Sequence, residues 1–115
     1  MAKIVQLILD EKTIIEECVL ANNFGSRLKG LLGKKNMGNW GALILVPCDM
    51  VHTIGMRFNI DIIFIDRGGE VLKIIKNLKP NRIAPRVPAG WAVIEMTGGM
   101  ADISGIKPYQ VLKWE

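Results

Sequence analysis

Few residues of this chain are of the kinds that form metal centres and catalytic triads. It has one histidine, His52, and two cysteines, Cys18 and Cys48, and it contains no CxxC pair. A structural zinc site takes four Cys or His ligands, and a disulfide framework takes several paired cysteines. The counts disfavour both, and they predict reduced thiols, no bound metal and no cofactor.

Long apolar runs are also missing. The longest uncharged apolar stretch, WGALILVPC at residues 40–48, is far shorter than the roughly 20 residues that a membrane-spanning helix needs. The apolar run near the N-terminus is too short for a signal peptide, and acidic residues follow it at once. We therefore expect a cytoplasmic protein without membrane contact.

Aromatic residues are absent where positive charge is densest. No aromatic residue lies between Phe64 and Trp91, and Glu70 is the only acidic residue between positions 67 and 91. Proteins that bind single-stranded nucleic acids usually stack the bases on aromatic rings. The run therefore indicates a solvated charged face, and weak nucleic-acid binding stays an alternative. Its basic residues are Arg67, Lys73, Lys76, Lys79, Arg82 and Arg86.

Hydrophobic residues are abundant and make up 50% of the 115 residues. A chain of this length buries a substantial core, so we expect residues 1–115 to form a single domain. Most apolar segments are short, rich in β-branched residues and separated by turn signals, as β-strands are. The expected strands lie at 3–9, 13–20, 42–46, 58–66, 71–76, 91–96 and 109–114, and an irregular proline-rich loop lies at 77–90.

Two short helices complete the expected fold. One has leucines at helical spacing between Asn22 and Gly33, and the other fits between Thr97 and Gly105. Most connections are too short for parallel crossovers, so antiparallel pairing should dominate. The predicted class is α+β, mainly antiparallel β: a curled sheet or small barrel of about six or seven strands with two short helices.

Two acidic residues, Asp61 and Glu95, each lie within an otherwise apolar strand. Burial of a carboxylate without a partner costs several kcal/mol or raises its pKa. Each acid can therefore form a structural salt bridge, with Arg27 or Arg57 as partner. Alternatively, both belong to a polar cluster at the mouth of the curled sheet that fixes a small ligand. The sequence favours the salt bridge and leaves the second interpretation open.

His52 lies four residues after Cys48. Pro47 and the β-branched residues that follow favour an extended segment, in which the two side chains are about 13 Å apart and cannot share a metal ion. A turn would bring thiol and imidazole close enough for a nucleophile pair. An inert thiol and a histidine bonded to backbone at a strand edge are the commoner arrangements.

A few further residues are candidates for contact with a ligand. Gly99 ends the strand-to-helix turn Thr97-Gly98-Gly99, whose backbone amides can face an anion, although a tight turn alone explains the glycines. Met56 can fill the core or line an adaptable pocket. Trp40 and Trp91 adjoin glycines, and each can cap the core or form a platform for a sugar.

Six segments in this order resemble the uncharacterised family called domain of unknown function 192. The resemblance spans about residues 26–112 and implies a mostly β, single-domain protein of bacteria and archaea with no assigned activity. Some members of that family are exported, whereas we expect this chain to lack a leader sequence. The family's recurring positions correspond here to Arg27, Gly30, Met56, Asp61, Glu95 and Gly99. The segments are SRLKGLLG, WGALILVP, VHTIGMRFNIDIIFIDRGGEV, NLKP, AVIEMTGG and ISGIKPYQVL.

These observations favour a small-ligand binding or accessory domain without its own chemistry, whose partner is an unknown small molecule or protein. One alternative is a small hydrolase-like enzyme that uses His52 with Asp61 or Glu95. Another is a weak nucleic-acid binder through Arg67–Arg86. The candidate ligand-binding residues are Arg27, His52, Met56, Arg57, Asp61, Glu95 and Gly99.

Overall fold

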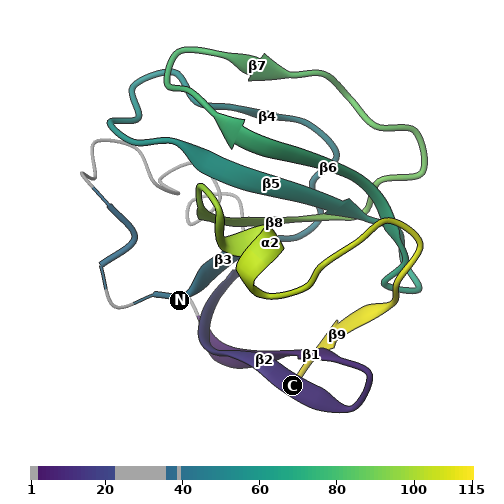
Figure 1. The fold of residues 1–115 in the computed structure, drawn as a ribbon. Helices are drawn as coiled ribbons and strands as arrows, with labels where there is room; N and C mark the ends of the chain where they lie inside the picture. The colour runs from purple at the N-terminus through teal and green to yellow at the C-terminus, as the bar shows by residue number, and fades with distance from the viewer. Residues whose placement is uncertain (1–2, 23–35, 39) are drawn as a thin grey trace.

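A curled seven-stranded β-sheet forms the body of the protein (Figure 1). The computed structural model describes residues 3–22, 36–38 and 40–115. The sheet has the strand order β6-β5-β8-β3-β2-β1-β9, and β4 and β7 form a separate two-stranded sheet. The elements are β1 (Lys3–Leu9), β2 (Lys12–Ala21), β3 (Ala42–Leu45), β4 (Val51–His52), β5 (Ile60–Ile65), β6 (Val71–Leu78), β7 (Ile83–Ala84), β8 (Ala92–Thr97), α2 (Met100–Ile103) and β9 (Leu112–Trp114).

Strand directions bring particular loops together at one end of the sheet. All neighbouring strands are antiparallel except β2 and β3, which are parallel. Because β3 and β5 both pair antiparallel with β8, they run in the same direction. The segments that follow β3 and β5 therefore lie beside the segment that precedes β8.

The sheet curls until its two edges meet at one end. Glu70, beside β6, forms an isolated bridge with Val111, beside β9. Two backbone bonds of 2.8 Å flank it: Val71 N–H donates to Gln110 O, and Leu112 N–H donates to Gly69 O. The result is a half-barrel, which confirms the predicted curled sheet.

Both faces of the sheet are buried, because side chains alternate along each strand. On one face, α2 packs through Ala101. On the other face, the β4–β7 pair packs through Val51 and Ala84. The first cluster includes Leu7, Cys18, Ile44, Ile63, Ile65, Ile94 and Met96, and the second includes Val19, Met37, Leu43, Met56, Ile60, Ile62, Phe64 and Val93.

The predicted strands of the large sheet are confirmed, with small changes at their ends. The last strand is only Leu112–Trp114, since Tyr109 has a φ of 73°, which is incompatible with a strand. Of the two predicted helices, α2 is present, and it is the only helix among the residues that the structure describes. The other prediction falls on residues 23–35, outside the described part.

The loop predicted at 77–90 is partly wrong. β6 extends to Leu78, and Ile83–Ala84 forms β7, which pairs with β4. Two-residue strands leave no periodic pattern, and the prolines on both sides obscure this one further.

Candidate functional site

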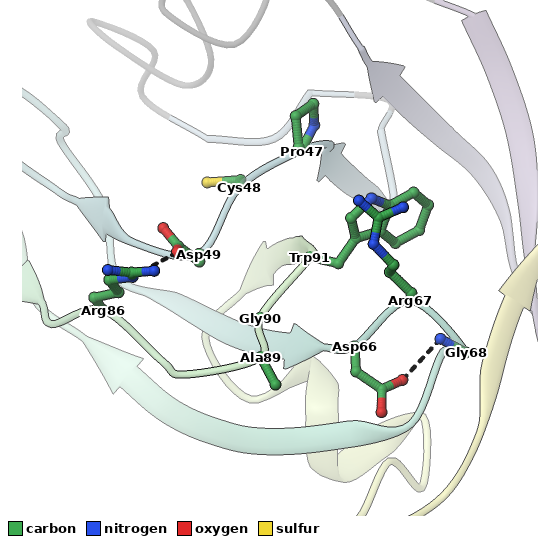
Figure 2. A pocket seen from close by; sticks show the side chains of 10 residues that line it. All are labelled: Pro47, Cys48, Asp49, Asp66, Arg67, Gly68, Arg86, Ala89, Gly90 and Trp91. Atoms are coloured by element: carbon green, nitrogen blue, oxygen red, sulfur yellow. Dashed lines mark hydrogen bonds and ion pairs between the residues drawn. The ribbon is translucent and has the colours of Figure 1, made fainter.

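A cleft of about 680 Å³ opens at the end of the sheet where β3 and β5 finish and β8 begins (Figure 2). We call it the Arg67–Trp91 cleft. The strand directions described above explain its position, since three connecting segments converge there. Its lining residues are Pro47, Cys48, Asp49, Asp66, Arg67, Gly68, Arg86, Ala89, Gly90 and Trp91.

Backbone hydrogen bonds hold the walls of the cleft together. The Cys48 N–H donates to Trp91 O, and the Trp91 N–H donates to Ile65 O, each at 2.8 Å. The Val87 N–H donates to Asp49 O at 2.9 Å. Segments from three parts of the chain are thus fixed relative to one another before any ligand arrives.

Two guanidinium groups lie toward opposite ends of the cleft, as Figure 2 shows. Arg86 Nε donates to Asp49 Oδ2 at 2.8 Å, an exposed ion pair. Arg67 lies over the Trp91 ring, with Cζ 6.0 Å from the ring centroid. Arg67 has no ion pair with an acid in the described part of the chain. Its guanidinium is therefore available to an anion.

An aromatic stack supports Arg67. The Trp91 and Trp114 rings are parallel within 6°, with centroids 5.9 Å apart. Cation–π contact with tryptophan orients a guanidinium. Below it, Asp66 Oδ1 accepts the N–H groups of Gly68 and Glu70, each at 2.9 Å, and this fixes the turn that carries Arg67.

The two cysteines have different environments, and they are not joined in a disulfide. Cys48 is half-buried in the cleft wall, and its Sγ donates to Met50 O at 3.2 Å. Cys18 lies in the core, where burial raises the pKa of its thiol to about 11. Cys18 is therefore inert at neutral pH.

Asp61 is fully buried near the start of β5, and its carboxylate accepts hydrogen bonds from backbone amides. Its Oδ1 accepts the Asn77 N–H at 2.8 Å, and its Oδ2 accepts those of Gly99 and Ala101 at 3.0 and 2.8 Å. The carboxylate thus ties β5 to β6 and to the turn before α2. The expected salt bridge of Asp61 with Arg57 is not formed, because three amides replace the cation.

Glu95 is buried on the opposite face of the sheet. Glu95 on β8 lies opposite Leu43 of β3 and Ile62 of β5. Asp61 lies opposite Met96, which is the next residue of β8. Neighbouring residues of a strand point to opposite faces. Burial raises the pKa of the Glu95 carboxyl to about 7, so this acid is substantially protonated at neutral pH. The two carboxyl groups therefore do not share a site.

His52 lies on the outer surface of β4 and is exposed. Its neighbour Val51 is the residue that faces the core. The structure thus separates the imidazole from both buried acids. Arg57 is exposed and makes no ion pair with a described acid.

The remaining candidates divide between two places. Met56 is buried in the cluster on the Glu95 face. Gly99 contacts Asp61 through its backbone N–H and has a φ of 95°, which favours glycine. Arg27 and Gly30 lie outside the described residues.

The sequence interpretation missed the cleft as a site. Arg67 and Arg86 were counted only as part of a basic run, and Cys48 was paired with His52. The sequence did contain a signal for the cleft, because charged residues follow two apolar strands closely. These are Asp49 in the pair Cys48-Asp49, and both residues of the pair Asp66-Arg67. Only knowledge of the strand order could show that these two segments meet.

The described residues contain no group of three or more His, Cys, Asp or Glu side chains arranged to hold a metal ion. They also contain no helix with the length and apolar character needed to cross a membrane.

Sequence and structure comparisons point to proteins of unassigned activity. The model of the family DUF192, described as "Uncharacterized ACR", matches residues 6–114. A protein of unknown function from Novosphingobium aromaticivorans has a similar structure, with a TM-score of 0.81 and 26% identity over 98% of this chain and 85% of that one.

A second structure, described as a candidate transcription regulator from Sinorhizobium meliloti, has a TM-score of 0.81 and 20% identity over 99% of this chain and 94% of that one. At this identity the likeness concerns the fold alone. No curated protein matches the chain.

Proposed function

The chain belongs to the DUF192 family of uncharacterised proteins, and on that premise we propose that it is a small-ligand binding domain without chemistry of its own. Its ligand occupies the Arg67–Trp91 cleft and carries a carboxylate or phosphate group. The observation that supports this most is the guanidinium of Arg67, which lies on Trp91 without an acidic partner among the described residues.

The site is partly ordered before a ligand binds. A guanidinium presents a planar fork of donors that matches carboxylate and phosphate oxygens. Here the fork is held by a ring stack and by a turn fixed through Asp66. These contacts restrict part of the side-chain freedom of Arg67 before an anion binds, so less of the interaction energy is spent on ordering it.

The charges of the other lining residues define how the anion is recognised. Asp49 neutralises Arg86, and the carboxylate of Asp66 accepts backbone amides. The formal charges of the lining side chains thus cancel. Recognition therefore rests on one oriented group and not on a broad positive field, and the affinity should depend only weakly on salt.

A titration with matched probes tests the proposal. Isotope-labelled protein is titrated with inorganic phosphate, benzoate and the neutral counterpart benzamide, and amide chemical shifts are followed by NMR. We expect the anions to shift residues 47–49, 66–68 and 89–91. Arg67→Met should weaken anion binding by roughly 10- to 100-fold, since a hydrogen bond to a charged group contributes about 1.5–3 kcal/mol.

Arg57→Met is the matched control, because it removes an equally exposed arginine outside the cleft. It should leave the dissociation constants unchanged. Equal binding of benzoate and benzamide, or equal effects of the two arginine variants, would contradict the proposal.

The enzyme and nucleic-acid alternatives have less support. A hydrolase that pairs His52 with Asp61 or Glu95 needs groups in contact, and those three lie on different surfaces or faces. In the basic run, Arg86 and Lys76 form ion pairs with Asp49 and Asp102, which leaves fewer cations for phosphates.

A further inference from the structure

Exposed large apolar side chains lie on or beside both strands of the small β4–β7 sheet. Along the segment 50–54, side chains alternate, with Val51 and Thr53 buried. The outward positions are Met50, 52% exposed, the exposed His52, and Ile54, 51% exposed. Ile83 of β7, 62% exposed, pairs with His52. The directly opposite side chains of an antiparallel pair lie about 5 Å apart, so His52 and Ile83 are adjacent. Met50 and Ile54 each lie two residues from His52 along the chain, and we call these four exposed residues the β4–β7 platform.

Thr53 makes the platform rigid from beneath. Its hydroxyl donates to Lys79 O at 2.6 Å and accepts the Arg82 N–H at 2.9 Å. Its backbone N–H donates to Arg82 O, and its carbonyl accepts the N–H of Asn81. One buried residue thus joins both segments, so the exposed aliphatic side chains are held in place and are not part of a loose loop.

Along the chain, the charged residues that flank the platform and form no ion pair with a described residue are all positive. Residues 50–60 and 71–94 contain no aspartate or glutamate. The exposed cations Arg57, Lys79 and Arg82 flank the platform in sequence and form no ion pair with a described acid. The nearest acid along the chain, Asp49, is bound to Arg86.

We propose that the β4–β7 platform is a protein-docking surface for an acidic segment that presents aliphatic side chains. Exposed apolar surface on a rigid support gains free energy when a partner covers it. The surrounding cations select a partner of opposite charge. The exposed aliphatic side chains offer nothing to a phosphate backbone, so a protein segment fits better than a nucleic acid.

The probe is a synthetic peptide of alternating glutamate and leucine, compared with its lysine–leucine counterpart. Isotope-labelled full-length protein is titrated with each peptide. We expect amide shifts from the acidic peptide at residues 50–55 and 82–84. The lysine peptide should bind at least roughly tenfold more weakly, because like charges then meet at the surface.

Ile83→Glu should abolish binding of the acidic peptide. Ile103→Glu is the control: Ile103 is 78% exposed on α2, which packs on the other face of the sheet. Equal binding of the two peptides, or equal effects of the two variants, would overturn the proposal. So would a concentration-dependent dimer in sedimentation that Ile83→Glu dissociates, since the occupant would then be a second copy of the chain.

Discussion

At the scale of single residues, Asp61 shows how a buried acid is accommodated without a direct ion pair to a described residue. Three backbone amides from two parts of the chain donate to it. We expect Asp61→Ala to lower the free energy of unfolding by at least about 3 kcal/mol, because each orphaned buried donor costs about 1–3 kcal/mol. Urea denaturation measures this.

Asp102→Ala is the comparison for Asp61. Asp102 forms an exposed ion pair with Lys76 at 2.7 Å. Exposed pairs contribute about 0–1 kcal/mol. If the two variants lost similar amounts of stability, Asp61 would not have the structural role described here.

Glu95 is the second buried acid, and it makes stability depend on pH. Its pKa is about 7 in the folded protein, against 4.5 for the ordinary group. Between these values the folded state holds more protons than the unfolded state, so stability falls as the pH rises from 4.5 to about 7. At about 1.4 kcal/mol per pKa unit, the loss is roughly 3 kcal/mol.

Glu95→Gln should remove most of this pH dependence and should be more stable than the wild type at alkaline pH. Urea denaturation at acid and alkaline pH gives the slope of the free energy of unfolding against pH for the wild type and for the variant. Glu17→Gln, at an exposed position of β2, should keep the wild-type slope. An unchanged slope in Glu95→Gln would show that another group titrates.

At the scale of elements, Thr53 supports the β4–β7 pair. Thr53→Val keeps the side-chain shape but removes the hydroxyl that bonds Lys79 O and Arg82 N–H. We expect a loss of about 1–3 kcal/mol and faster hydrogen exchange of the Arg82 amide. Thr53→Ser, which keeps the hydroxyl, should show little of either effect.

The elements were predictable where the pattern is long and local. The apolar segments IVQLIL and IDIIFI predict β1 and β5 because isoleucine and valine make up at least half of each segment. β4 and β7 are only two residues each and depend on Thr53, which forms hydrogen bonds to residues more than 25 positions away in the chain. No local signal reports such a contact.

The lack of a local signal for long-range contacts also explains which parts of the candidate site could be predicted. Asp61 and Glu95 were recognised as acids within apolar strands, and the structure buries both of them. Their placement on one rim was wrong, because their faces follow from the register of β5 against β8. The cleft depends on β3 and β5 being neighbours of β8, which is again a property of strand order.

At the scale of the whole molecule, closure of the half-barrel depends on Gly69. Its φ is 89°, and an added Cβ would lie 2.1 Å from Leu112 O. Gly69→Ala should therefore lower the melting temperature strongly, since it opens the contact between the two sheet edges. Differential scanning calorimetry tests this.

Gly105→Ala is the matched control for Gly69. Gly105 also has a positive φ, 74°, but an added Cβ would meet no atom within 4 Å. Its substitution should cost only the backbone strain, about 1–2 kcal/mol. Equal losses in the two variants would mean that strain, and not the close approach to Leu112, explains the effect at Gly69.

The pairing of β1 with β9 joins Leu7 to Trp114, and the bridge between Glu70 and Val111 depends on the same C-terminal segment. Contacts between residues so distant in the chain form late, because the entropy of loop closure opposes them until other strands are in place. The protein should therefore fold on a timescale of roughly milliseconds to seconds. While it does so, β1 and β6 present unpaired edges to any neighbouring chain.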